Sequence, residues 1–184
     1  MTFPAFDPLQ LPVEIFARQG QVLEGLWPLA SLTRLQDSTH PQGGASSTAV
    51  VAWKLRGESR ASRVGTPEIW LHLRSSADVR LICQRCLQSV MQHISAERSF
   101  RFVHGESTAA ELDAQSEDDV LALGRFLDAR ELTEDELLLS LPLVPRHEVC
   151  PQPLVATQSV PNDDAEPEHP FATLAQLKRG KPIG

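Results

Sequence analysis

The length, composition and charge of the chain exclude several kinds of protein. Its 184 residues, 41% hydrophobic and 22% charged, are enough for one ordinary domain with a core and are unlike a fully disordered chain. No apolar run approaches the roughly 18 residues of a membrane-spanning helix, and the opening MTFPAFDPLQLP lacks the features of a signal peptide. The three cysteines, an odd number without a secretion signal, indicate reduced thiols or a metal site in a cytoplasmic protein.

The charge is divided unevenly along the chain. Residues 1–105 contain 11 Lys and Arg against 8 Asp and Glu, a net of +3, whereas residues 106–184 contain 6 against 16, a net of −10. Because cations that meet phosphates supply most nucleic-acid affinity, a direct RNA contact is expected only in the first part. The acidic second part would repel RNA and suits a basic protein partner.

The first residues predict short helices around one strand. A helix is expected over residues 12–19, with the following glycine as its stop, because an earlier start at Asp7 would enclose a proline. Residues 21–25 are expected to form a short strand. A second helix is expected over residues 28–36, where three leucines share one side. These leucines are Leu29, Leu32 and Leu35.

Period-two alternation of apolar and polar residues predicts strands in the middle of the chain. They are expected at residues 50–59, 68–74, 79–83, 90–103 and 120–123. The segment 75–78, Ser-Ser-Ala-Asp, is short enough for a hairpin turn, so the strands on its two sides should be antiparallel. The acidic segment 104–119 is interpreted as a loop that contains a helical turn.

The clearest helix signal lies at residues 128–141, before Pro142. Two capping boxes are possible, one with Asp128 and Glu131 and the other with Thr133 and Glu136. Four leucines supply the expected apolar face, and the adjacent acids of the first turns are interpreted as a solvated face that favours the helix dipole. The leucines are Leu132, Leu137, Leu138 and Leu139, and the acids are Glu134, Asp135 and Glu136.

Together these patterns predict an α+β fold, with a mainly antiparallel sheet and a few packing helices, in one domain over residues 1–150. Residues 151–184 are rich in proline and acid, and they are interpreted as a disordered, flexible tail. Within it, a short terminal helical motif would present three apolar residues to a partner. These docking residues are Phe171, Leu174 and Leu177.

Two short motifs carry the best chemical signal. Cys83-x2-Cys86 and His147-x2-Cys150 have the ligand types and local spacings of a tetrahedral Cys3His zinc site, so the chain is expected to hold one structural zinc ion. The 60 residues between Cys86 and His147 exceed the gap of usual zinc modules. The alternative is a pair of apolar thiols at a strand end with an unrelated surface histidine.

An enzyme is the less favoured interpretation. Arg85, between the two thiols, would lower a cysteine pKa and suits a thiol oxidoreductase, but such motifs begin a helix, and strands are expected on both sides here. No common catalytic or nucleotide-binding motif is present, so neither catalysis nor a small-molecule substrate is predicted.

Five arginines lie in sequence around the cysteine pair. They are Arg74, Arg80, Arg85, Arg98 and Arg101. Arginine suits phosphate recognition, and strand alternation would place some of them on one face, so they are candidates for an RNA or partner surface. The alternative is a set of solvated strand edges that prevents aggregation.

Three segments in order resemble one known family. They are CQRCL at 83–87, EDELLLSLPLVPRHEVC at 134–150 and PFATLAQLK at 170–178, and together they resemble the YceD family of large ribosomal RNA subunit accumulation proteins. The openings FDPLQL and QVLEG are also similar to that family. The resemblance implies a bacterial, cytoplasmic, non-enzymatic ribosome biogenesis factor that acts in synthesis, processing or stability of 23S (large-subunit) ribosomal RNA.

The expected partners are therefore large-subunit ribosomal RNA, a basic ribosomal protein or both, with no membrane. Two other functions stay open. One is a protein-interaction adaptor with a structural zinc site and no direct RNA contact. The other is a thiol oxidoreductase that uses Cys83 and Cys86.

Overall fold

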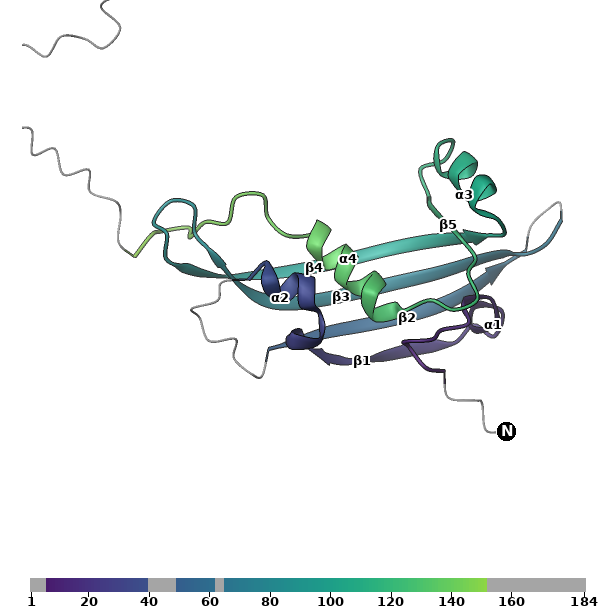
Figure 1. Ribbon diagram of the computed structural model, residues 1–184, viewed down its shortest axis with the longest axis horizontal. Helices are drawn as coiled ribbons and strands as arrows, with labels where there is room; N and C mark the ends of the chain where they lie inside the picture. The colour runs from purple at the N-terminus through teal and green to yellow at the C-terminus, as the bar shows by residue number, and fades with distance from the viewer. Residues whose placement is uncertain (1–5, 40–48, 62–64, 152–184) are drawn as a thin grey trace, which may run out of the picture. The chain divides into compact units, whose positions relative to one another are not determined.

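The computed structural model describes residues 6–39, 49–61 and 65–151 (Figure 1). The elements in chain order are α1 (Val13–Arg18), β1 (Val22–Pro28), η1 (Leu29–Ser31), α2 (Thr33–Asp37), β2 (Val50–Arg60), β3 (Glu68–Ile82), β4 (Ser89–Val103), α3 (Glu106–Asp113), β5 (Asp119–Ala122) and α4 (Ala129–Leu139). None of the helices within these ranges is long and apolar enough to cross a membrane. The predicted docking residues Phe171, Leu174 and Leu177 lie outside the described residues, and the domain boundary at residue 150 stays a prediction.

The five described strands form one sheet in the order β1-β2-β3-β4-β5. The first three pairings are antiparallel, and β4 pairs with β5 in parallel. The parallel pairing needs a crossover, which α3 supplies between β4 and β5. The prediction of an α+β fold with a mainly antiparallel sheet is confirmed.

The predicted turn at residues 75–78 is wrong, because β3 continues through it as one strand of 15 residues. Ser75 pairs with Trp53 of β2 on one side and with Ala96 of β4 on the other. Backbone groups that are bonded on both sides of a central strand outweigh the turn preference of Ser and Asp. The turn between β3 and β4 therefore falls at residues 83–88, which contain the cysteine pair.

The covered face of the sheet, defined by odd-numbered residues of β3 and their cross-strand partners, is buried against α1, α2 and α4 (Figure 1). Two apolar clusters share it. One contains Leu35 of α2, Leu137 of α4 and the thiols of the cysteine pair. The other contains Phe16 of α1 with Leu71 and Phe100 of the sheet. The predicted strand alternation is confirmed, and the three leucines of residues 28–36 are all buried. The single helix predicted over these residues is wrong, because β1 extends to Pro28 and the rest is divided between η1 and α2.

Asp128 is the N-cap of helix α4, and its carboxylate accepts hydrogen bonds from the backbone N–H groups of Arg130 and Glu131 at 2.9 and 3.1 Å. Of the two predicted capping boxes, the first therefore supplies the N-cap residue. The assignment of Leu139 to the apolar face is wrong, because its side chain is 74% exposed while Leu137 is fully buried. Residues advance by about 100° each along a helix, so these two leucines lie about 200° apart.

Two acids of α4 are buried, so their prediction as a solvated face is wrong. Arg34 of α2 donates to Glu134 Oε2 at 3.0 and 3.1 Å, and the backbone N–H of Leu35 donates to Glu134 Oε1 at 3.0 Å. Arg98 of β4 donates to Glu136 Oε2 at 3.2 Å, and burial raises the pKa of Glu136. Because each acid has a cationic partner on another element, these carboxylates fix α4 to α2 and to the sheet.

Candidate metal centre

The cysteine pair lies on the tight turn that joins β3 to β4. The backbone N–H of Cys83 donates to the carbonyl of Gln88 at 2.9 Å, and the N–H of Leu87 donates to the carbonyl of Cys83 at 2.9 Å. Leu87 takes a left-handed conformation, with φ of 60°. This geometry reverses the chain within a few residues and buries the thiols of Cys83 and Cys86.

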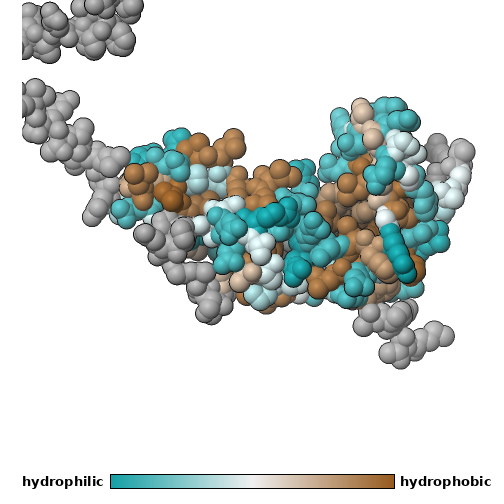
Figure 2. Space-filling model, in the orientation of Figure 1, coloured by the Kyte–Doolittle hydropathy of each residue, from teal (hydrophilic) through white to brown (hydrophobic). Residues whose placement is uncertain are grey.

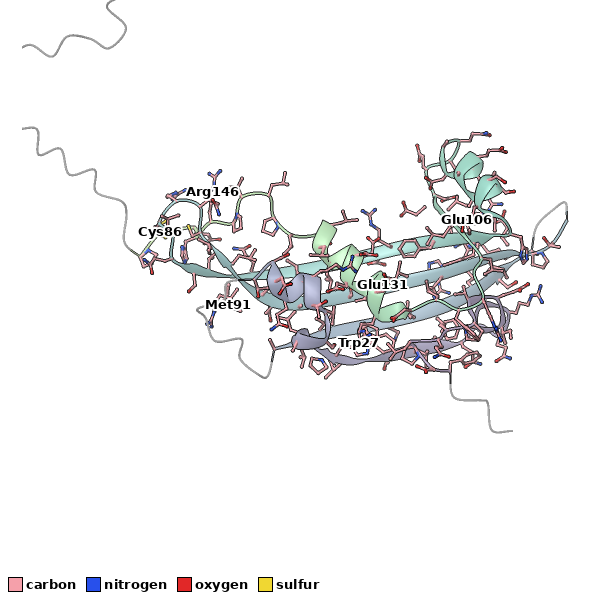
Figure 3. All side chains as sticks on the ribbon, viewed as in Figure 1. Trp27, Cys86, Met91, Glu106, Glu131 and Arg146 are labelled. Atoms are coloured by element: carbon pink, nitrogen blue, oxygen red, sulfur yellow. The ribbon has the colours of Figure 1, made fainter. Side chains whose placement is uncertain are left out.

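The second pair of predicted ligands comes from the segment after α4. The backbone N–H of Gln84 donates to the carbonyl of Pro145 at 2.9 Å. The amide of Gln92 donates to the carbonyl of Arg146 at 3.4 Å. These bonds hold the segment against the hairpin, and Figure 3 shows Cys86 and Arg146 at the same end of the sheet.

The structure brings the four predicted ligands together. The ligand atoms of Cys83, Cys86, His147 and Cys150 all lie within 4.8 Å of one another. The sulfurs of Cys83 and Cys150 are 3.9 Å apart, and Cys86 Sγ lies 3.4 Å from His147 Nδ1. A tetrahedral zinc ion with ordinary bond lengths places two sulfurs about 3.8 Å apart and a sulfur and a nitrogen about 3.6 Å apart. The arrangement can therefore hold one metal ion.

The histidine is oriented for this role. His147 Nε2 lies 3.1 Å from the carbonyl oxygen of Ser89, which can only accept a hydrogen bond, so Nε2 carries the proton. In the neutral ring, Nδ1 then carries the lone pair and faces Cys86 Sγ at 3.4 Å. A histidine that donates its other ring N–H to a carbonyl is the usual outer-shell arrangement of a metal ligand.

The thiols differ in their electrostatic surroundings. Burial raises the pKa of Cys83, but hydrogen bonds from the backbone N–H groups of Cys86, His147 and Arg85 outweigh it and lower the pKa to about 5. Burial and the two neighbouring sulfurs raise the pKa of Cys150. One thiolate is therefore formed readily at neutral pH, and the thiolate is the form that binds metals.

The surroundings of the cysteine pair argue against thioredoxin-like chemistry. The motif lies between two strands, as the sequence predicted, and not at the start of a helix in a βαβ unit. All three cysteines are free thiols, and a separation of 3.9 Å between Cys83 and Cys150 is far longer than a disulfide bond of about 2.05 Å.

The five predicted arginines do not share one surface. By strand alternation, Arg74, Arg80 and Arg101 lie on the open face of the sheet, opposite α1, α2 and α4, whereas Arg98 lies on the covered face. Arg74 pairs with Glu97 at 2.6 Å, Arg98 with Glu136 at 3.2 Å and Arg101 with Glu68 at 3.0 Å. Arg85 is exposed on the hairpin turn. Their role in RNA or partner contacts stays a prediction.

Sequence reasoning missed the exposed surface around the four ligands. Arg146 directly precedes His147 and is exposed. Apolar side chains are exposed on the same two segments, namely Leu87 (65%), Leu143 (100%), Val144 (47%) and Val149 (85%). Figure 2 shows apolar surface over the hairpin turn and the segment after α4. The only available sequence signal was the position of these residues beside the expected ligands.

The fold and site define a small α+β protein with a Cys3His cluster that joins a β-hairpin to a distant segment. A family model described as large ribosomal RNA subunit accumulation protein YceD matches residues 71–178, which include all four cluster residues. Because this span exceeds half of the chain, the protein belongs to the YceD family, and the resemblance seen in its sequence is confirmed.

One curated relative is the large ribosomal RNA subunit accumulation protein YceD of Haemophilus influenzae. It is 34% identical over 106 residues, which cover 55% of this chain and 61% of the relative. The alignment thus spans about three fifths of the relative's length. No solved structure matches this chain.

Proposed function

We propose that this protein is a cytoplasmic, non-enzymatic factor that supports the accumulation of large-subunit ribosomal RNA. The observation that carries the proposal is the family match over residues 71–178. The name of the Haemophilus influenzae relative supports it, because that protein is named for the same role.

We further propose that Cys83, Cys86, His147 and Cys150 hold one structural zinc ion. Three thiols and an imidazole suit zinc among the common biological metals. Four protein ligands complete a tetrahedral shell and leave no open position for a substrate, which is the pattern of structural zinc sites. The ion would crosslink the hairpin turn to the segment after α4, and this role agrees with a non-enzymatic factor.

The cellular role is tested by depleting the protein and measuring large-subunit against small-subunit ribosomal RNA. The ratio is expected to fall on depletion and to recover when the wild-type chain is supplied again. A ratio that stays constant during growth without the protein would contradict the proposed role.

The zinc site is tested by metal analysis of protein purified without chelator. About one zinc per chain is expected for a closed four-ligand site. A double variant, Cys83→Ser with Cys150→Ser, serves as the matched control and should contain almost none. Equal zinc in the two preparations would show that the metal is bound elsewhere.

A further inference from the structure

Most cations of the described residues already have a carboxylate partner. These paired residues are Arg18, Arg34, Lys54, Arg56, Arg60, Arg74, Arg98, Arg101 and Arg130. Arg125 instead lies over the ring of Phe126. Neither Arg85 nor Arg146 forms an ion pair with any described carboxylate, although both are exposed.

Contacts between the residues on either side of these two arginines hold their two backbone segments close together. The residues that precede them, Gln84 and Pro145, share a backbone hydrogen bond of 2.9 Å. The residues that follow them are Cys86 and His147, and Cys86 Sγ lies 3.4 Å from His147 Nδ1. The backbone positions of both arginines are therefore fixed by the same geometry that forms the metal centre.

We propose that Arg85 and Arg146 form a clamp for the phosphates of single-stranded RNA, an inference that rests on the proposed function. A guanidinium donates to a phosphate through two parallel hydrogen bonds. Arg74 would first have to leave Glu97 to make such a contact, whereas the clamp arginines have no described ion pair to break. The clamp thus offers two positive charges to a phosphate, whereas most other cations of the described residues are already neutralised by a carboxylate.

Exposed aliphatic side chains extend the clamp. Leu87 and Leu143 are exposed on the same two segments as the arginines and offer apolar surface to unstacked bases. Segments 79–92 and 139–151 contain no Phe, Trp or Tyr. Because aromatic stacking is missing from these segments, binding is expected to depend mainly on phosphate contacts, with strong salt dependence and little sequence preference.

The test measures binding of the full chain to a labelled single-stranded oligouridine as a function of salt. The clamp variant, Arg85→Ala with Arg146→Ala, is compared with a control that also removes two positive charges, Arg18→Ala with Arg56→Ala, whose arginines pair with Glu14 and Glu58. The clamp variant should bind about tenfold more weakly and reduce the slope of log K against log salt by about 1.4, which corresponds to two phosphate contacts on a single strand. The control should change affinity less than about twofold, because its arginines are ion-paired.

A second variant and a metal measurement keep the result interpretable. Arg85→Lys with Arg146→Lys should retain the salt slope while it loses the paired hydrogen bonds of the guanidinium groups. Unchanged zinc content in all variants would show that the metal centre is intact. If the clamp variant were to lose its zinc, the lysine variant alone would test the proposal. A lysine variant whose slope of log K against log salt falls as far as that of the alanine variant would then overturn the proposal.

The clamp and the proposed function can fail separately. Oligouridine binding that is equal in the clamp variant and the wild type would overturn the clamp, as expected if the arginines bind an acidic protein instead. The depletion experiment would still decide the cellular role. Conversely, a clamp that binds RNA in a cell whose ribosomal RNA ratio is unaffected by depletion would stand while the proposed function fell.

Discussion

Gly57 lies where the backbone of α1 comes close to the sheet. A Cβ atom at this position would lie 2.7 Å from the Cα of Ala17 and 2.8 Å from the carbonyl oxygen of Phe16. Both contacts are to backbone atoms of α1, which a side-chain rotation cannot move away. Glycine at this position therefore allows α1 to pack on β2 and to bury Phe16 completely.

Replacement of this glycine is expected to destabilise the fold. Gly57→Ala should lower the free energy of unfolding by about 1–3 kcal/mol, because the added methyl group must push α1 away from the sheet. Denaturant unfolding measures the change. Gly124→Ala is the matched control, since its nearest neighbour would be 3.6 Å away, an ordinary contact. Equal stability of the two variants would contradict the packing argument.

The metal ligands could be predicted from the sequence, but the ion pairing of the arginines could not. Ligand chemistry depends on residue type and local spacing, so Cys83 and Cys86 with His147 and Cys150 were found from the sequence. Whether an arginine has a carboxylate partner depends on residues that are distant in the sequence. Arg98 and Arg85 both lie near the cysteine pair in the sequence. Arg98 pairs with the buried carboxylate of Glu136, whereas Arg85 forms no ion pair with any of the described residues. No local pattern distinguishes them.

The open face of the sheet is stabilised by pairs of charged side chains that connect neighbouring strands. Lys54 pairs with Glu24 at 2.7 Å, and Arg74 pairs with Glu97 at 2.6 Å. Glu58 of β2 lies 2.7 Å from His72 Nε2 of β3 and 2.9 Å from the guanidinium of Arg60. The Lys54–Glu24 and Arg74–Glu97 pairs place opposite charges across neighbouring strands and stabilise the register of this uncovered face.

The pairs around Glu58 predict a dependence of stability on pH. Hydrogen bonds from Arg60 and His72 lower the pKa of Glu58 from 4.5 to about 2. Since the pKa is lower in the folded chain, the stabilisation is complete above pH 4.5 and is lost as the pH falls towards 2. Glu58→Gln should therefore lower stability at pH 7 by on the order of 1 kcal/mol, after allowance for solvent screening, and the difference should vanish near pH 2.

Denaturant unfolding of both proteins across this pH range measures the difference, so acid effects on the rest of the molecule cancel. Glu97→Gln is the control, because its carboxylate is 69% exposed and its ion pair with Arg74 is expected to add at most about 0.5 kcal/mol. A constant difference between Glu58→Gln and the wild type at every pH would contradict the assignment.

Elements were predicted best where local pattern and tertiary contacts agree. The helix at α4 and the alternating strands have periodicities that match their buried faces. The turn expected at residues 75–78 failed, because partners on both sides of a central strand come from distant parts of the sequence. The burial of Glu134 was missed for the same reason, since Arg34 lies 100 positions before it.

At the scale of the described molecule, the cysteine cluster continues the hydrophobic core. Cys83 and Cys86 belong to the same apolar cluster as Leu137 of α4, and Cys150 packs against it. The core of α1 and the sheet forms a second cluster further along the strands, and Trp27 packs against both. A metal ion would therefore stabilise one end of the fold directly, and the other end should keep its packing when the ion is removed.

Metal removal is expected to loosen that end and to lower the melting temperature. If free zinc is about 1,000 times the dissociation constant, binding to the folded chain adds about 4 kcal/mol, or about 8–16 °C for a domain of this size. A strong chelator should remove this increase in melting temperature, and added zinc should restore it.

Amide hydrogen exchange should rise at residues 84–88 and 143–150, whose backbone is held around the cluster, and stay slow in β2 near Gly57. The Cys83→Ser, Cys150→Ser variant should melt at the lower temperature with or without chelator. A chelator shift of equal size in that variant, or none in the wild type, would contradict a metal crosslink between the hairpin and the segment after α4.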